Sequence, residues 1–232
     1  LAAWDAQDLK DAHAAAAALL AYAEHPQGRA LPPVKRLQVA RSDELIDLPA
    51  GTRRNLELTH TLRGETSPTL FSLLDTCHTG MGSRALRSWL LEPRRERTQA
   101  RERLGAIGLL RGGLWQGLRA ELKGSSDVER ITARTALRQV RPRELVGLTA
   151  TLARSAQLAR ALAAGIGATP PALLQRIAAD LTPPPGCAEL LAQAIAPEPA
   201  ALVRDGGVIA DGFDAELDEL RGIQTNCDGF LI

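Results

Sequence analysis

Residues 67–93, SPTLFSLLDTCHTGMGSRALRSWLLEP, predict two short helices that meet at a glycine elbow. The hydroxyl of Ser67 can cap the first helix, and Pro68 suits its first position because no hydrogen-bond donor is needed there. The apolar residues of this helix follow at spacings of three and four, as Leu70, Leu73, Leu74 and Cys77. This spacing predicts a single apolar stripe.

Two glycines separate the first helix from the second. Gly80 and Gly82 interrupt the apolar pattern, and the second helix is expected to begin near Ser83. Its apolar face consists of Leu86, Trp89 and Leu90. Pro93 ends this helix, because the residue before a proline is displaced from the α region. The two helices form a packing unit, and their residues show no catalytic pattern.

The composition predicts a mainly α-helical protein of one or two domains. A chain of 232 residues can bury a substantial core. Hydrophobic residues make up 45% and aromatic residues 3%, so the core must come mostly from Leu, Ala, Val and Ile. Leucine and alanine favour helices. Further helices are expected over residues 4–24, 51–64, 94–110, 145–164, 171–181 and 187–196, with one or two short extended segments at 34–39 and 208–209.

Charge and cysteine usage exclude several classes of protein. A formal net charge of +1 gives the whole chain no attraction to a polyanion. No apolar run approaches the roughly 20 residues needed to span a bilayer, and the first residues lack a signal-peptide pattern. We therefore expect a cytoplasmic protein without a membrane partner. The dispersed three cysteines and four histidines argue against a disulfide framework and a metal site, so no metal, cofactor or catalytic residue is predicted.

The segment from residue 84 to residue 103 is locally basic, with seven arginines and three glutamates. One interpretation is a solvated helix face with ion pairs between neighbouring turns. The other is a patch that faces phosphates. The first is favoured, because no aromatic residues that could stack on bases are interleaved among the arginines at 94–103. The candidate weak phosphate contacts are Arg94, Arg95, Arg97 and Arg101.

Residues 125–145 predict a capped helix followed by a second one. Ser125 or Ser126 can cap a helix that has an acid at its third position, and Pro142 marks the next helix start. Asp127 and Glu129 beside arginines could be acid–base machinery or ion pairs that orient helices. Ion pairs are favoured, because neither a histidine nor a nucleophile lies nearby in the sequence.

The C-terminal segment VRDGGVIADGFDAELDELR, residues 203–221, predicts two turns and a helix. The turns are at 205–207 and 211–212, on either side of the extended pair 208–209. A phosphate-binding loop is excluded here, because the chain contains no G-K-[ST]. Asp211 is the expected N-cap of the helix, with Asp214 three residues on. The apolar seam of the helix has heptad spacing, with Phe213, Leu217, Leu220, Gln224, Cys227 and Leu231.

Four segments, in this order, resemble the MutS family of DNA mismatch-repair proteins. The first is RRNLEL at residues 53–58, and the last is the RDGGVIA segment described above, with Phe213 at an aromatic position. The second matches LD-x-T-x-T-x-MG-x-R-x-LR-x-WL-x-x-P through Asp75, Thr79, Met81, Gly82, Arg84, Leu86, Arg87, Trp89, Leu90 and Pro93, with Cys77-His78 as a local variation. The third matches DLERL-x-x-R-x-x-L…RP-x-x-L through Asp127, Glu129, Arg130, Arg134, Leu137, Arg141, Pro142 and Leu145.

The resemblance implies a fold and a division of the chain. The expected fold is the mainly α, multi-helix core (lever) domain of MutS type, as a fragment of a longer protein. Residues 1–30 would be the C-terminal helix of the connector region, and residues 31–203 the helical core. Residues 204–232 would be a turn and the lever helix toward a clamp. The candidate structural or relay residues are Asp75, Gly82, Arg84, Asp127, Glu129, Arg130, Asp205, Gly206 and Gly207.

The resemblance also implies a function. The fragment would be structural and not an enzyme, and it would couple the state of an ATPase to a DNA clamp in a protein that recognises mispaired DNA. Its parent would be a bacterial, cytoplasmic and nucleoid-associated DNA-dependent ATPase that uses ATP and Mg. The parent, expected as a homodimer, would bind mismatched double-stranded DNA and mismatch-repair proteins, whereas the fragment would be a monomer. The alternative is a stand-alone helical adaptor for protein partners, and a small-molecule enzyme lacks any suitable constellation of residues.

Overall fold

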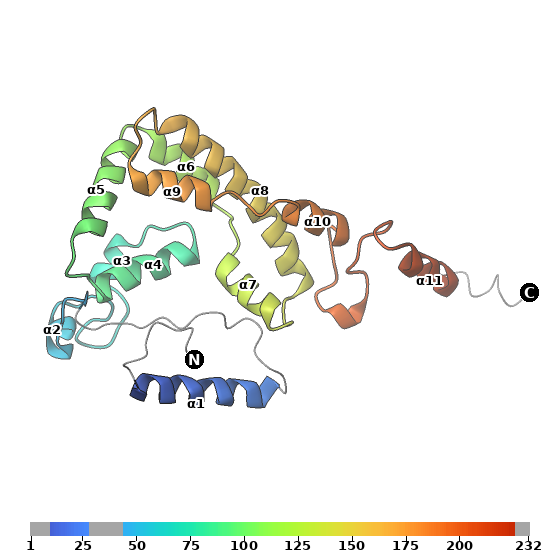
Figure 1. Ribbon diagram of the computed structural model, residues 1–232, viewed down its shortest axis with the longest axis horizontal. Helices are drawn as coiled ribbons and strands as arrows, with labels where there is room; N and C mark the ends of the chain where they lie inside the picture. Colours follow the sequence, from blue (N-terminus) through green and yellow to red (C-terminus); the bar gives the residue numbers. More distant parts are fainter. Residues whose placement is uncertain (1–9, 28–43, 226–232) are drawn as a thin grey trace, which may run out of the picture. The chain divides into compact units, whose positions relative to one another are not determined.

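A computed structural model describes residues 10–27 and 44–225 of the chain, and these residues are mostly helical (Figure 1). The chain divides into two compact units, residues 1–47 and 48–232. No β-sheet forms among the described residues, and the predicted mainly α fold is confirmed. An antiparallel bridge joins Ile195 to Ile209, where the sequence predicts a short extended segment. The other predicted extended segment, 34–39, lies outside the described residues.

The first unit contains α1, Lys10–Gln27. Alanine has the highest helix propensity of all residues, and this segment is rich in it. The helix extends to Gln27, past the predicted end at residue 24, and residues 4–9 of the predicted range lie outside the described part of the chain.

The second unit contains the remaining helices. They are α2 Ala50–Asn55, α3 Leu70–Leu74, α4 Gly80–Leu91, α5 Thr98–Leu110, α6 Leu114–Leu122, α7 Val128–Ala136, α8 Pro142–Gly165, α9 Ala172–Asp180, α10 Cys187–Ala194 and α11 Ala215–Thr225, with a 3-10 turn at Val203–Asp205. Most helix ends of the sequence-based prediction agree within a few residues. The exceptions are α6, which was not predicted, the start of α5, which was predicted at residue 94, and the helix ends near α2, α3 and α4.

The long helix α8 is the spine of this unit. It has 24 residues and is therefore about 36 Å long. Pro142 occupies its first turn as predicted, and the carboxylate of Glu144 accepts a hydrogen bond of 2.9 Å from the backbone N–H of Arg141. Four helices, α6, α7, α9 and α10, pack against it (Figure 1).

The main hydrophobic core lies at the C-terminal end of α8. Leu162 and Ile166 are buried there with Ala106 of α5 and Leu174 of α9. The helices approach closely at Gly165, where an added Cβ would lie 2.7 Å from both methyl carbons of Leu114. A side chain at this position would require the Leu114 side chain of α6 to shift.

The apolar stripe predicted over residues 70–77 is wrong. Helix α3 begins at Leu70 because Thr69 and Ser72 cap each other: the N–H of Ser72 donates to Oγ1 of Thr69 at 3.1 Å, and the N–H of Thr69 donates to Oγ of Ser72 at 2.8 Å. The helix ends at Leu74, so Cys77 lies outside it. Leu73 is 76% exposed and therefore does not contribute to a core.

Two further helix limits differ from prediction. Helix α4 begins at Gly80 rather than near Ser83, because Oγ1 of Thr79 accepts a hydrogen bond of 3.1 Å from the N–H of Gly82. The two glycines therefore lie in its first turn rather than in an elbow before it. The helix predicted over 51–64 stops at Asn55, and Glu57 takes a φ of 44°, which reverses the chain.

Three predicted N-caps are also wrong, the first of them Ser67, because Thr69 caps α3. Asp127, not Ser125 or Ser126, caps α7, and its carboxylate accepts from the N–H of Arg130 at 3.3 Å. The backbone of Ser126 is engaged elsewhere, since its N–H donates to Thr151 of α8 at 2.9 Å.

Asp214 replaces Asp211 at the start of α11. Its carboxylate accepts from the N–H of Leu217 at 3.0 Å, whereas Asp211 pairs with the Arg221 side chain at 2.9 Å. Two members of the predicted seam of α11, Cys227 and Leu231, lie outside the described residues. Phe213 and Leu220 of the same seam are 43% and 57% exposed.

Candidate functional site

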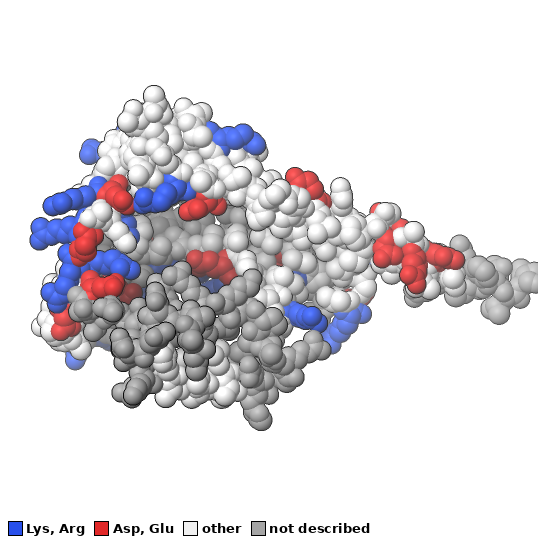
Figure 2. All heavy atoms as spheres, viewed as in Figure 1, with Lys and Arg blue, Asp and Glu red and all other residues white. Residues whose placement is uncertain are grey.

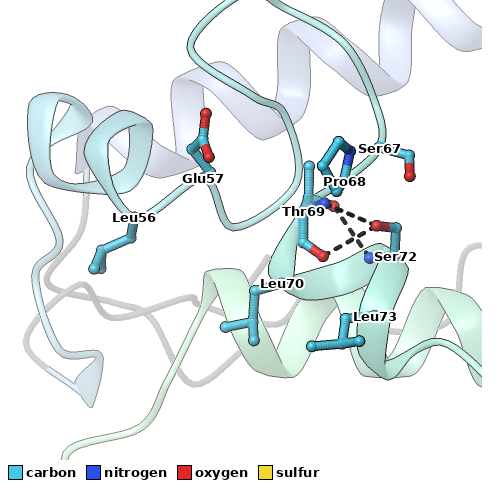
Figure 3. Close-up of a pocket in the computed structure, with 8 residues that line it drawn as sticks. All are labelled: Leu56, Glu57, Ser67, Pro68, Thr69, Leu70, Ser72 and Leu73. Carbon is cyan, nitrogen blue, oxygen red and sulfur yellow. Dashed lines mark hydrogen bonds between the residues drawn. The ribbon is translucent and has the colours of Figure 1, made fainter.

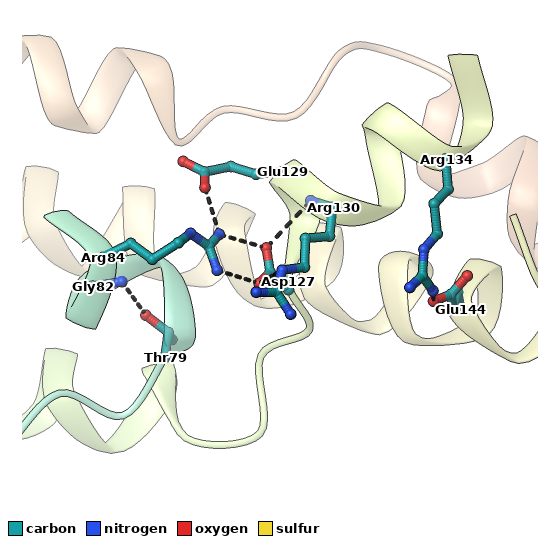
Figure 4. Close-up of polar contacts among 8 residues, drawn as sticks. All are labelled: Thr79, Gly82, Arg84, Asp127, Glu129, Arg130, Arg134 and Glu144. Atoms are coloured by element: carbon teal, nitrogen blue, oxygen red, sulfur yellow. Dashed lines mark hydrogen bonds and ion pairs between the residues drawn. The ribbon is translucent and has the colours of Figure 1, made fainter. Parts of the chain in front are cut away.

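An ion-pair cluster joins α4 to the start of α7 (Figure 4). Arg84 of α4 forms a two-pronged contact with Asp127, with Nη1–Oδ2 and Nη2–Oδ1 distances of 2.6 and 2.8 Å. Its Nη2 also lies 2.5 Å from a carboxylate oxygen of Glu129. Planar guanidinium groups favour such paired contacts with carboxylates, so the cluster fixes direction as well as distance. The interpretation of these carboxylates as helix-orienting ion pairs fits this geometry.

The cluster shifts the ionisation of its members. The hydrogen bond from Arg84 is the main cause that holds the pKa of Asp127 below its ordinary value of 3.8. The hydrogen bond to Asp127 in turn raises the pKa of Arg84. The side chains are 39% and 25% exposed for Arg84 and Asp127, so the pair is partly shielded from solvent. Both groups are therefore charged at neutral pH, and neither is poised to transfer a proton.

Helix α4 is attached to the helices around α8 without a shared buried core. None of its side chains is fully buried, and the main core cluster has no member before Ala106. Polar and aromatic contacts provide the attachment instead. Besides the Arg84 cluster, the guanidinium of Arg103 lies 3.7 Å from the ring centre of Trp89, and Arg119 donates to the backbone oxygen of Thr76 at 2.5 Å. Interfaces of this polar kind are typical of parts that move relative to each other.

Two other predicted relay residues, Arg130 and Asp75, lie at the edges of this attachment. Arg130 is a secondary partner of Asp127, with its Nε 3.5 Å from Oδ2. Asp75 accepts hydrogen bonds from the hydroxyl of Ser83 at 2.9 Å and the N–H of Cys77 at 3.2 Å. Burial acts to raise the pKa of Asp75, but these hydrogen bonds outweigh it and the pKa is lowered.

Gly82 lies within the first turn of α4. A Cβ at this residue would be 3.1 Å from Oγ1 of Thr79 and 3.3 Å from Cβ of Cys77. The tight approach keeps the loop before α4 folded against the first turn of the helix, and it places Thr79 where it caps α4.

The predicted relay residues at 205–207 form a separate, exposed turn. Asp205 ends the 3-10 turn, and its carboxylate lies 3.7 Å from the Nε of Arg204. Gly206 and Gly207 have φ values of 75° and 62°, which L-residues with a side chain rarely adopt. Their role is to reverse the chain before the bridge at Ile209, and the cluster around Arg84 does not include them.

The arginines between residues 84 and 103 lie on α4, on α5 and on the segment between these helices. Arg84, Arg87 and Arg103 are engaged with protein groups, the last two over the rings of Phe71 and Trp89. The candidate phosphate contacts are all exposed and lie just before or within the first turn of α5: Arg94, Arg95, Arg97 and Arg101. Figure 2 shows basic side chains gathered at the edge of the molecule where α5 lies, with acidic ones between them.

Acidic neighbours temper the charge of this surface. Hydrogen bonds from Thr98 lower the pKa of Glu96, and the nearby charge of Arg101 acts in the same direction. Glu102 pairs with Arg176 of α9 at 2.7 Å rather than with an arginine of its own helix. The surface therefore keeps only a modest local excess of positive charge.

Three connecting contacts were not predicted from the sequence. Trp89 and Arg103 stack across two helices, Arg119 holds the loop before α4, and Arg134 of α7 pairs with Glu144 of α8. No periodic signal could have revealed these contacts, because each one joins two separate elements.

A shallow pocket of about 560 Å³ lies beside α3 (Figure 3). Its apolar lining includes Leu56, Leu70 and Leu73, and the Thr69–Ser72 capping pair forms part of its wall. No group of three or more His, Cys, Asp or Glu side chains that could hold a metal ion occurs in residues 10–27 and 44–225. Within those same ranges, no helix is long and apolar enough to cross a membrane.

Residues 51–229 match the family model described as MutS domain III. The match covers most of the chain, from the start of α2 past the described end of α11. It includes both sides of the Arg84 cluster and the exposed arginines of α5.

Proposed function

The chain belongs to the MutS family, and on this basis we propose that it is the core, or lever, module of a protein that recognises mispaired DNA. MutS domain III is a non-catalytic domain, so the work of this module is mechanical. In our proposal it transmits changes between an ATPase domain and a DNA clamp elsewhere in the parent protein. ATP and Mg would act on that parent, and this chain would neither bind nor hydrolyse ATP.

The observation that carries this proposal is the polar attachment of α4. A transmission module needs rigid parts and at least one joint between them. Helices α5, α6, α8 and α9 share a buried apolar core, and α7 packs against α8, so we infer that these helices move as one body. Helix α4, in contrast, buries no side chain completely. The contact of Arg84 with Asp127 and Glu129 holds α4 in one position on that body. Its release would let α4 shift without unfolding the core.

A mutation-frequency assay in the source organism tests this proposal. The variant Arg84→Ala should raise the spontaneous mutation frequency toward that of a deletion of the gene, with the protein level unchanged on immunoblots. The matched control is Arg160→Ala, which removes an exposed arginine of α8. If deletion of the gene leaves the mutation frequency at the wild-type value, the chain has no part in mismatch repair. If deletion raises the mutation frequency but Arg84→Ala leaves it at the wild-type value, the contact of Arg84 is not the joint between α4 and the other helices.

The exposed arginines of α5 support a subsidiary proposal. Arg94, Arg95, Arg97 and Arg101 would make weak phosphate contacts with the DNA that the parent holds, without sequence or mismatch preference. Partners in the parent would thus be mismatched double-stranded DNA and other mismatch-repair proteins, with the parent acting as a homodimer.

The adaptor hypothesis remains the second candidate because of the pocket in Figure 3. Leu73 at its edge is 76% exposed, which suits a contact with a protein partner. A Leu73→Asp variant distinguishes the two hypotheses. An adaptor would lose its partner in a pull-down, whereas the transmission module would keep a wild-type mutation frequency.

A further inference from the structure

A second cavity, of about 250 Å³, lies where several helices of the second unit meet. Its walls come from the first turn of α4, the ends of α6 and α9, the start of α7 and the middle of α8. Met81, Leu122, Val128, Leu152 and Leu158 supply much of its apolar lining. It is separate from the shallow pocket beside α3, with which it shares no residue.

The polar groups of this cavity are largely occupied by the protein itself. The hydroxyl of Thr151 donates to the backbone oxygen of Gly147 at 2.7 Å and accepts from the N–H of Ser126. The hydroxyl of Ser155 donates to the backbone oxygen of Leu181. A buried water molecule needs two to four polar partners, and these groups have little capacity left. Apart from Ser125 and the carboxylate of Asp180, the lining therefore favours an apolar guest over water.

We propose that this cavity binds a small uncharged aromatic molecule. A dry apolar cavity of about 150 Å³ is large enough for a benzene ring, so the present volume accommodates a fused pair of rings. A poorly hydrated apolar pocket binds such ligands favourably because little ordered water must be displaced. An anionic ligand is disfavoured, because the charged side chain of the lining is the carboxylate of Asp180.

The cavity lies between α4 and α7, the two helices that the Arg84 cluster joins. Met81 precedes Arg84 by one turn of α4, and Val128 directly follows Asp127 at the start of α7. A ligand in the cavity would add apolar contacts between the two walls that the ion pair already joins. Binding would therefore stabilise the docked position of α4. The inference does not depend on a role in mismatch repair, since binding can be measured on this chain alone.

Met81 provides a direct reporter, because it is the only methionine of the chain. Protein labelled with ¹³C in the methionine methyl group gives one signal from the cavity wall. We expect indole, used as the probe, to shift that signal in a saturable manner, with a dissociation constant on the order of 1 mM. An intermolecular nuclear Overhauser effect between indole and the Met81 methyl group should accompany the shift.

Variants that fill the cavity complete the test. The substitutions Leu152→Phe on α8 and Val128→Phe on α7 each place a larger side chain in the cavity and should abolish the shift of the Met81 signal. Thermal unfolding of each variant shows whether it is folded. The control Leu104→Phe adds the same ring at a residue that is 67% exposed and outside the cavity lining, and it should leave binding unchanged. The proposal is overturned if the Met81 signal does not saturate, or if folded filling variants still bind indole. If both fail to fold, the Overhauser contact in the wild-type chain decides, and its absence counts against the site.

Discussion

The carboxylate of Asp127 has two roles, as a helix cap and as the ion-pair partner of Arg84. Asp127 caps α7 through the N–H of Arg130 and binds the guanidinium of Arg84 from α4. One side chain thus sets the start of a helix and holds another helix in place. Because the two roles use different chemistry, separate substitutions can remove them one at a time.

The substitution Asp127→Asn should remove the charge and keep the cap, since asparagine caps helices about as well as aspartate. The pKa of Asp127 is lower in the folded chain than its ordinary value of 3.8. The carboxylate therefore stabilises the fold fully above that ordinary value, and the contribution is lost as the pH falls through the folded pKa. We expect the variant to have a smaller free energy of unfolding at neutral pH and to match the wild type in acid.

Urea unfolding at several pH values measures this difference. The control Asp180→Asn changes an exposed aspartate at the end of α9 and should leave the unfolding curve unchanged at neutral pH. The substitution Asp127→Ala loses the cap as well and should cost about 1 kcal/mol more than Asp127→Asn. If the free energy of unfolding of Asp127→Asn is lower than that of the wild type by the same amount at every pH, the charge of Asp127 is not the cause of the difference.

At the scale of elements, two glycines within helices have opposite functions. Gly105 of α5 has no atom within 4 Å of an added Cβ, whereas Gly165 of α8 faces Leu114 of α6 at 2.7 Å. The first glycine only weakens its helix. The second permits the close contact of α6 and α8 on which the core is built.

Alanine substitutions should therefore change stability in opposite directions. Gly105→Ala should raise the free energy of unfolding by about 1 kcal/mol through helix propensity. Gly165→Ala should lower it by about 1–3 kcal/mol, because the methyl group overpacks against Leu114. Chemical denaturation measures both. In a Leu114→Ala background the cost of Gly165→Ala should vanish, and persistence of that cost would refute the proposed collision.

Replacement by alanine should cost much more unfolding free energy at a buried leucine of α8 than at an exposed leucine of α3. Leu162 is 3% exposed in the main core, and Leu162→Ala should cost about 2–5 kcal/mol of unfolding free energy. Leu73 is 76% exposed, and Leu73→Ala should change it by less than about 0.5 kcal/mol. A comparable loss for both in calorimetry would mean that α3 belongs to the core after all.

At the scale of the whole molecule, charge distribution matters more than net charge. The chain carries only +1 overall, yet exposed arginines gather along the N-terminal part of α5 (Figure 2). Acidic neighbours such as Glu96 limit this excess. Any attraction to DNA should accordingly be local, weak and sensitive to salt.

Replacement of Arg95, Arg97 and Arg101 by glutamine should weaken DNA binding and reduce its salt dependence. Each arginine that contacts a phosphate contributes about 0.9 to the slope of log K against log salt. Fluorescence anisotropy with matched and mismatched duplexes measures both quantities, and we expect the two duplexes to bind alike. The control replaces Arg138, Arg160 and Arg204 and removes the same charge. Equal losses in the two triple variants, or selective binding of the mismatch, would contradict a phosphate surface on α5.

Prolines and paired glycines predicted the ends of elements correctly where the end depends only on neighbouring residues of the chain. Pro142 and Pro93 mark the start of α8 and the end of α4 because a proline acts on its immediate neighbours. The same holds for the paired glycines at 206–207, which have positive φ values. Asp127 and Asp214 cap the two helices instead of the predicted Ser125, Ser126 and Asp211, and the carboxylate of Asp211 pairs with Arg221 of α11.

The sequence by itself determined the family, the mainly helical fold and the candidate residues Arg84, Asp127 and Glu129. Those follow from residue order and from spacing along single helices, which are properties of a linear chain. Only the tertiary structure decided that Arg84 binds Asp127, that Trp89 stacks on Arg103 and that Cys77 and Leu73 leave the core. Contacts across tens of residues depend on how helices pack, and helix packing depends on complementary surfaces that helical periodicity does not encode.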